Sequence, residues 1–208
     1  MNRLLIIGAS GHGKVAADIA RLSGYEDIVF LDNDKNIKSC AGYHVLCPDS
    51  MVSQLDGDVF IAVGNAEIRK RLMHRNHDRQ FPVLIHPDAV IASDVEIGNG
   101  TVIMAGTVIN PGVRIGCGCI VNTSSSIDHD CTIGDFCHVS VGSHLAGTVT
   151  VGSNTWIGAG STVSNNINIC SDVIIGAGAV VIRDIKISGT YIGVPAKIIG
   201  PKSHGSKA

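Results

Sequence analysis

The sequence predicts two domains, an α/β domain with a parallel sheet over residues 1–84 and a parallel β-helix over residues 85–208. Two observations predict this order. The first half alternates short apolar runs, glycine turns and amphipathic stretches, which is typical of strands and helices in succession. The second half carries an aliphatic residue at every sixth position, a period that fits neither an α-helix nor a simple strand.

The six-residue period continues for eighteen steps, and every step is aliphatic. The repeated positions are Ile85, Ile91, Ile97, Ile103, Ile109, Ile115, Val121, Ile127, Ile133, Val139, Leu145, Val151, Ile157, Val163, Ile169, Ile175, Val181 and Ile187. Aliphatic residues form roughly a quarter of ordinary sequences, so chance does not explain this run. A short strand followed by a corner does explain it, and three such units make one triangular coil.

A second period supports the coil. One glycine recurs every 18 residues, at Gly98, Gly116, Gly134 and Gly152. The residues four places after the aliphatic ones are mostly small or β-branched, namely Thr101, Thr107, Val113, Cys119, Ser125, Cys131, Cys137, Ser143, Val149 and Thr155. We expect them to share the narrow interior with the aliphatic stack, in an unbroken register that needs a cap at each end.

The first half contains two strand–turn–helix units. In "RLLIIGASGHGKVAADIARL" an apolar run at 4–7 precedes a glycine turn and a helix near 14–22. "DIVFLDND" is a second strand that ends at Asp32. "DVFIAVGNAEIRKRLMHR" repeats the pattern, with a strand at 59–63 and a helix from about Ala66, and "FPVLIHP" is a last short strand. This order indicates a small Rossmann-like domain.

The first glycine turn predicts a site for a phosphorylated ligand, because a strand–glycine turn–helix unit exposes backbone N–H groups at a helix N-terminus. The dinucleotide fingerprint is absent, since the glycines at 8, 11 and 13 lack the G-x-G-x-x-G order and Ser10 replaces the middle glycine. A nucleotide attached to a sugar needs only one such cradle. The alternative is a turn that serves packing alone, for which the polar His12 is not required.

Composition excludes several classes of protein. The formal net charge is −2, so no basic field indicates a nucleic-acid or anionic membrane partner. No run of 18 apolar residues predicts membrane insertion, and glycine and charge interrupt the N-terminus too early for a signal peptide. The seven cysteines are odd in number and form no paired CxxC sets, which favours buried thiols in a reducing cytoplasm over disulfides or zinc.

His129, in "SIDHDCTIGD", is the main candidate for catalysis. It lies two residues after an inward position, so its side chain should point outward near a corner, and the flanking acids can hold its tautomer and raise its basicity. Spacing alone leaves a solvated surface histidine equally open. A zinc site with His138 and His144 is a further alternative. Spacings of nine and six hinder convergence within one chain, although an interface of a trimer could bring the three histidines together, and we expect no metal.

The order of "GASGHGKV", "FLDND", "AVGNAEIRK", "NTSSSIDHDCTIGDFCHVSVGSHLAG" and "YIGVPAK" resembles one family along nearly the whole chain. It is similar to the sugar acetyltransferases of the sialic-acid O-acetyltransferase type, and within them to the N-acetyltransferases of UDP-linked 4-amino-4,6-dideoxy sugars of bacillosamine synthesis. The resemblance implies a left-handed β-helix behind a nucleotide-sugar-binding domain. It also implies acetyl-CoA as co-substrate and a homotrimer.

The resemblance assigns roles to individual residues. For catalysis it implies a general base, His129, oriented by Asp130, although close relatives more often have glutamate at the second position. For the nucleotide-sugar it implies Ser10, Gly11 and His12 at the phosphates, Asp32 and Asn33 at the uridine, Gly64 beside it, and Asn122 at the sugar. For acetyl-CoA it implies His138, Gly147, Ala159, Ala177 and Lys197.

The predicted reaction is direct acetyl transfer from acetyl-CoA to the 4-amino group of a UDP-linked amino-deoxy sugar. His129 would take the amine proton, and the backbone N–H of Gly147 is the expected oxyanion donor. One alternative is O-acetylation of sialic acid or of another sugar hydroxyl. A non-catalytic nucleotide-sugar-binding protein and a metal-dependent β-helix protein are the others.

Overall fold

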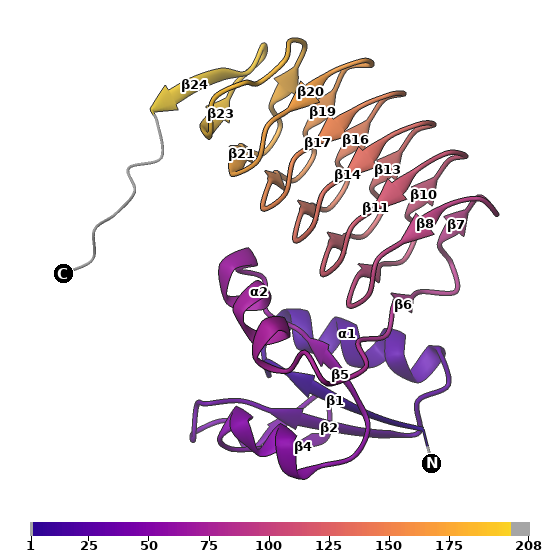
Figure 1. Ribbon diagram of the computed structural model, residues 1–208, viewed down its shortest axis with the longest axis vertical. Helices are drawn as coiled ribbons and strands as arrows, with labels where there is room; N and C mark the ends of the chain where they lie inside the picture. Colours follow the sequence, from indigo (N-terminus) through magenta and orange to yellow (C-terminus); the bar gives the residue numbers. More distant parts are fainter. Residues whose placement is uncertain (1, 201–208) are drawn as a thin grey trace.

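The structure, a computed structural model, describes residues 2–200 and confirms the fold class. An α/β domain is followed by a parallel β-helix whose coils stack above it, and the last strands lie at the far end of the stack (Figure 1). Residues 201–208, the end of the domain predicted over residues 85–208, lie outside the described residues.

The α/β domain is built on a five-stranded sheet with the order β3-β4-β2-β1-β5, parallel except for the β3–β4 pair. Its strands are β1 (Arg3–Ile7), β2 (Asp27–Leu31), β3 (Ser39–Cys40), β4 (Tyr43–Leu46) and β5 (Asp58–Ile61), and its helices are α1 (Gly11–Leu22), the 3₁₀ helix η1 (Asp49–Gln54) and α2 (Ala66–Arg75). Alternate residues of β1 face opposite ways, so Leu4 and Ile6 pack with α1, whereas Leu5 and Ile7 pack with η1 and α2.

The β-helix has three faces. The first face contains β6 (Leu84–Ile85), β9 (Val102–Ile103), β12 (Ile120–Val121), β15 (His138–Val139), β18 (Trp156–Ile157), β21 (Val173–Ile175), β23 (Gly189–Ile192) and β24 (Lys197–Gly200). The second contains β7 (Val90–Ile91), β10 (Val108–Ile109), β13 (Ser126–Ile127), β16 (His144–Leu145), β19 (Thr162–Val163) and β22 (Val180–Val181). The third contains β8 (Glu96–Ile97), β11 (Arg114–Ile115), β14 (Thr132–Ile133), β17 (Thr150–Val151) and β20 (Asn168–Ile169).

The two interior positions are confirmed for the hexads from Ile103 to Val181, whereas Ile85, in the first hexad, is 37% exposed. The repeated aliphatic residues from Ile103 to Val181 are all 4% exposed or less, and the second set from Thr101 to Thr155 is 1% exposed or less. Hydroxyls of the second set donate to corner carbonyls of the next coil, as Thr101 does to Gly116 at 2.8 Å and Ser143 to Gly158 at 2.9 Å. Small polar side chains therefore fit the interior because each finds a backbone acceptor there.

The corner glycines are required by the spacing between coils. A Cβ added at Gly134 would lie 2.6 Å from the backbone nitrogen of Ser153 in the next coil. Real contacts of this kind are longer, so any side chain at this corner forces adjacent coils apart.

The expected register fails at the C-terminal end. Ile187 is 63% exposed, and Ile185 takes the inward position, 4% exposed and bridged to Ile169. The offset between these bridged residues is 16 rather than the 18 of earlier coils, because the turn after Val181 is two residues shorter. At the other end, the strand expected in "FPVLIHP" is β6, which pairs with β9 and begins the β-helix.

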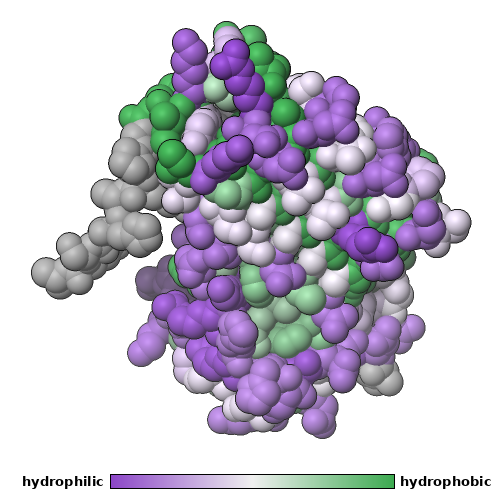
Figure 2. Space-filling model, turned by 45° about the horizontal axis from the view of Figure 1, so that its top comes forward, coloured by the Kyte–Doolittle hydropathy of each residue, from purple (hydrophilic) through white to green (hydrophobic). Residues whose placement is uncertain are grey.

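The α/β domain covers the N-terminal end of the coil stack. Helix α1 lies between the sheet and the first face, where its apolar residues share one buried cluster with residues of the β-helix. The contributing β-helix residues are Leu84, Val102, Met104 and Ile120. At the far end, apolar residues gather on the surface (Figure 2), and they include Ile187, Ile192, Val194, Ile198 and Ile199. The two ends of the stack are thus capped unequally.

Helix α2 follows the corner between the third and first faces. Met73 of the helix packs against Gly118 of the corner, where an added Cβ would lie 3.0 Å from its sulfur. Arg69 donates to the carbonyls of Gly118 and Phe136. Glu67 accepts a hydrogen bond from Asn154 at 2.9 Å. The three corner residues are spaced by 18, one per coil. A helical turn rises about 5.4 Å and strands lie about 4.8 Å apart, so successive turns meet successive coils.

The part of the chain that the structure describes, residues 2–200, contains no membrane-spanning helix and no disulfide. No helix within residues 2–200 is long and apolar enough to cross a membrane. All seven cysteines lie in this part of the chain as free thiols, four of them buried, so the disulfide framework is absent there.

We expect Gly134→Ala to lower the free energy of unfolding by about 1–3 kcal/mol, because the added methyl group has no room between the coils. Chemical denaturation of wild type and variant measures the difference. Gly11→Ala is the matched control, since a Cβ at Gly11 meets nothing within 4 Å. Equal destabilisation by both changes, or none by the first, would contradict this account of the corner.

Candidate functional site

His129 lies on the corner between the second and third faces, in the turn that joins β13 to β14. Its Nδ1 is 2.8 Å from Oδ2 of Asp130, and its side chain is 57% exposed. Asp130 has a φ of +59°, a left-handed conformation that lets the turn bring its carboxylate back beside the imidazole. Asp128 accepts hydrogen bonds from Asn110 and from the backbone N–H of His129, which fixes the turn further.

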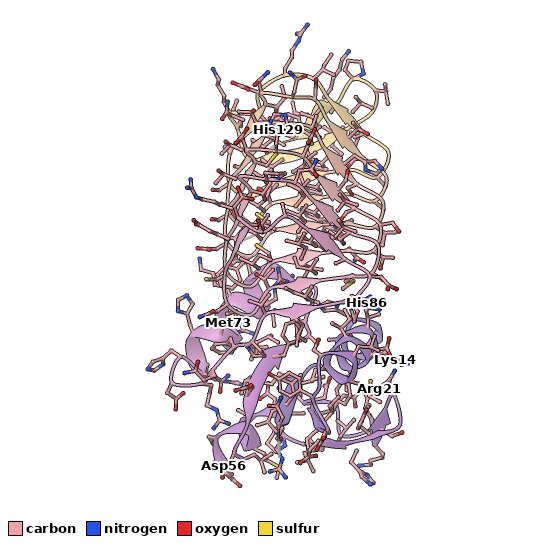
Figure 3. The ribbon with its side chains drawn as sticks, turned by 90° about the vertical axis from the view of Figure 1, so that its right-hand side faces the viewer. Lys14, Arg21, Asp56, Met73, His86 and His129 are labelled. Atoms are coloured by element: carbon pink, nitrogen blue, oxygen red, sulfur yellow. The ribbon has the colours of Figure 1, made fainter. Side chains whose placement is uncertain are left out.

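The surroundings of His129 favour a basic imidazole. Its pKa is raised, first by the hydrogen bond to Asp130 and then by the negative charge of Asp128. A neutral ring that donates from Nδ1 to Asp130 leaves a lone pair on Nε2. This arrangement is that of a general base held by a carboxylate. His129 lies on the upper coils in Figure 3, well away from Met73 and His86 near the domain junction.

Gly147 lies on the same corner, one coil later. A Cβ at this position would be 2.5 Å from Nε2 of His129, so only glycine lets the ring occupy its place. Within residues 2–200, the backbone N–H of Gly147 donates to no protein acceptor. The corner therefore combines an imidazole with an available backbone donor.

At the carboxyl edge of the α/β sheet, here called the nucleotide edge because the sequence predicts a nucleotide there, a cavity of about 140 Å³ is lined by Gly8, Asp32, Asn33 and Val63 among others. Asp32 accepts from the backbone N–H of Ala9 at 2.8 Å, which closes the first glycine turn. The side-chain amide of Asn33 donates to Asp49, and its oxygen accepts from the backbone of Asp49. Asp32 and Asn33, the two residues expected at a uridine, thus shape the loops around this cavity.

The first glycine turn leaves Ser10 and Gly11 exposed at the start of α1, with no side-chain cap on the helix. Gly13 is buried against the backbone of Gly8. The pKa of His12 is lowered to about 4, first by burial and then by the charge of Arg69. His12 is therefore neutral near pH 7 and offers a phosphate at most one hydrogen bond and no charge.

A second cavity, the junction cavity, lies where α2 meets the β-helix and has a volume of about 450 Å³. It is lined by Gly64, Asn65, Ala66, Glu67, Phe136, His138, Asn154, Thr155, Trp156, Asp172 and Ile174. Its aromatic wall is a stacked pair, His138 and Trp156, with ring centroids 5.6 Å apart. The amide nitrogen of Asn122 is 3.1 Å from Nε2 of His138, which joins two residues that were expected at different ligands.

The pKa of His138 is lowered to about 4, by burial first and then by the charges of Arg69 and His12. A neutral His138 accepts from Asn122 on Nε2 and keeps a donor on Nδ1. The amide of Asn122 is itself oriented, because its oxygen accepts from the backbone of Thr123 at 2.8 Å. His138 therefore lines the cavity as a neutral group, and Asn122 orients its ring through the hydrogen bond to Nε2.

The residues expected at acetyl-CoA do not converge within one chain. Gly147 is beside His129, whereas Ala159 and Ala177 are exposed and stack on the corner between the first and second faces. His138 faces the junction cavity. Lys197 lines a separate hollow of about 470 Å³ near the C-terminal end, together with Arg183 and Tyr191. Each corner of the β-helix thus carries a different part of the predicted site.

Sequence reasoning missed two residues that shape the junction. Arg69 is 1% exposed, although its place three residues before Leu72 on the buried side of α2 was a signal. Trp156 lies 18 residues after His138, so the coil period placed the two rings in register. For the zinc alternative, no group of three or more His, Cys, Asp or Glu side chains in the described range 2–200 could hold a metal ion.

Comparisons with known proteins agree with both domains. Residues 3–76 match the family model of the PglD N-terminal domain, and residues 82–111 match that of the bacterial transferase hexapeptide. A UDP-N-acetylbacillosamine N-acetyltransferase of Bacillus subtilis (strain 168) is 38% identical over 114 residues. That match spans 50% of this chain and only 52% of the Bacillus protein.

Solved structures match over almost the whole chain. The acetyltransferase domain of PglB from Neisseria gonorrhoeae, in complex with acetyl coenzyme A, is 40% identical with a TM-score of 0.91, over 96% of this chain and 100% of that one. PerB from Caulobacter crescentus, in complex with CoA and GDP-perosamine, is 37% identical with a TM-score of 0.90, over 96% and 98%. The chain therefore belongs to the hexapeptide-repeat sugar N-acetyltransferases that carry a PglD-type N-terminal domain.

Proposed function

We propose that this protein transfers the acetyl group of acetyl-CoA to the 4-amino group of a UDP-linked amino-deoxy sugar, with His129 as general base. The observation that carries the proposal is the imidazole on an open corner, with Nδ1 bound to Asp130 and Nε2 beside Gly147. The relatives support the class of reaction, since one is named as an N-acetyltransferase of a UDP-sugar and others were solved with acetyl-CoA, CoA or GDP-perosamine.

The proposed step needs no covalent enzyme intermediate. The neutral amine attacks the thioester carbonyl while Nε2 of His129 takes one of its protons. The carbonyl oxygen becomes an oxyanion, for which the backbone N–H of Gly147 is the proposed donor. The C–S bond then breaks, the CoA sulfur leaves as a thiolate and receives the proton from the imidazolium, and the amide product is released. Asp130 stabilises the imidazolium between these two transfers.

The proposed acceptor site uses both cavities of the junction side. Val63 lines the nucleotide edge and its neighbour Gly64 lines the junction cavity, so one loop borders both. We place the uridine near Asp32 and Asn33. The phosphates lie at the start of α1 with Ser10, Gly11 and His12, and the sugar lies in the junction cavity near Asn122. The stacked rings of His138 and Trp156 offer an apolar plane to the deoxy part of the sugar.

One chain cannot bring His129 to that sugar, because His129 lies on the corner between the second and third faces, whereas α2 and the junction cavity lie at the corner between the third and first. We therefore propose a homotrimer in which each active site combines His129 of one copy with the junction cavity of another. Acetyl-CoA would lie between copies along Ala159, Ala177 and Lys197. Sedimentation equilibrium that gave the mass of a single chain in the active protein would refute this arrangement.

Two rivals are separated by an assay of acetyl-CoA turnover, and the third by elemental analysis. The purified protein is offered a UDP-linked 4-amino-4,6-dideoxy sugar, its GDP-linked counterpart and sialic acid. We expect turnover with the first acceptor. Preference for sialic acid would favour O-acetylation, and binding of the nucleotide-sugar with no turnover would favour a sensor. Stoichiometric zinc in elemental analysis would favour the metal-dependent alternative.

His129→Ala should lower kcat by about 10² or more, the scale of losing a general base. Steady-state kinetics with the UDP-linked acceptor measures it, with circular dichroism to confirm the fold. His74→Ala is the control, because His74 is an exposed histidine of α2 away from the corner. An unchanged kcat in the His129 variant would remove this residue from the chemistry.

Asp130→Asn should shift the acidic limb of the pH–rate profile to lower pH and lower its plateau. The base must be neutral to act, and Asp130 raises the pKa of His129, so loss of the carboxylate lets the ring lose its proton at lower pH. Asparagine tolerates the left-handed backbone at this position, so the turn is retained. The profile of kcat/KM is compared with that of Asp78→Asn, an exposed acid of the other domain. A limb that stays in place would contradict the pairing.

A further inference from the structure

Arg69 is the most fully buried charge of the junction. It is 1% exposed, and four carbonyl oxygens accept from its guanidinium. Nε donates to Gly118 at 2.6 Å and Nη2 to Phe136 at 2.9 Å, both on the β-helix. Nη1 donates to Val63 at 2.8 Å and to Gly64 at 3.0 Å, both in the loop after β5. One side chain therefore joins the two domains through directional bonds.

The acceptors of Arg69 lie behind the proposed substrate site. Val63 lines the nucleotide edge, and Gly64 and Phe136 line the junction cavity. The guanidinium lies on the far side of these walls and lines neither cavity. It can thus set the position of the walls without contact with a ligand.

The chemistry of the Arg69 guanidinium favours a role in positioning the walls over a role in merely holding the two domains together. No carboxylate within the described residues 2–200 forms an ion pair with Arg69, and burial lowers its pKa to about 10, so it stays charged near neutral pH at a cost in solvation. An apolar side chain would hold two surfaces together without that cost. A planar guanidinium donates its hydrogen bonds in fixed directions, whereas the three donors of a lysine share one nitrogen and rotate freely.

We propose that Arg69 is a positioning residue. Its four hydrogen bonds to carbonyl oxygens fix the spacing between the nucleotide edge and the junction cavity, so that an acceptor bound by its nucleotide places its amine at one position. This inference rests on the proposed function. A nucleotide-linked acceptor is anchored at one end and reacts at the other, so a small change in this spacing displaces the amine. A misplacement of about 1 Å can lower the rate about 10²-fold.

The test compares Arg69→Met and Arg69→Lys with Arg71→Met, an exposed arginine of the same helix. With the UDP-linked acceptor, we expect both Arg69 variants to lower kcat by about 10²-fold. The KM for acetyl-CoA, measured in a separate titration with acetyl-CoA, should stay unchanged. With the same amino sugar without its nucleotide, the variants should match the wild type, because no handle remains to misplace the amine. Measurements are made well below the midpoint of thermal unfolding of each variant.

Two outcomes overturn the proposal. One is a kcat of Arg69→Met within twofold of wild type on the UDP-linked acceptor, and the other is an equal loss on both acceptors. If the wild type acetylates neither acceptor, the proposed function fails, and hydrogen exchange tests Arg69 separately. We then expect the segment 62–68 to exchange at least tenfold faster in Arg69→Met, with 27–31 unchanged. Equal exchange in both proteins would leave Arg69 no positioning role.

Discussion

The fit of each coil on the next is the constraint on which the rest of the structure depends. Strand pairs repeat at an offset of 18, and the corner glycine Gly134 leaves no space for a side chain between coils. Because two residues of each hexad from Ile103 to Val181 fill the interior, the outward residues there have fixed places on faces and corners. A rigid prism of this kind can present an exposed imidazole in one orientation without a surrounding pocket.

The α/β domain is attached to this prism through helix α2, which meets one coil per turn. Its polar contacts fall on corner residues spaced by 18, and Arg69 is the one that binds both domains through backbone carbonyls. The nucleotide edge and the β-helix therefore keep one relative position. His129 and the junction cavity occupy different corners of one chain, so the reaction proposed above depends on association of copies as much as on either domain.

Much of the fold could be predicted from periodicity. The interior residues, the outward direction of His129 and the glycine corners follow from a six-residue repeat, because a regular coil converts position in sequence into position in space. The same rule failed at Ile187, where a turn shortened by two residues gives its place to Ile185. It also gave His12 no special role at the junction, since its partial burial and the charge of Arg69, 57 residues later in the chain, are invisible to local spacing.

The sequence by itself determined the coil, the strand–turn–helix units and the pair His129–Asp130, because each depends on neighbours within a few residues or on an unbroken period. Only the tertiary structure decided that Arg69, His12 and His138 gather at one junction and that Trp156 completes a cavity there. These contacts join residues tens of positions apart and depend on how α2 docks on the corner. Docking is set by the shape and hydrogen-bonding groups of two surfaces, which no local pattern records.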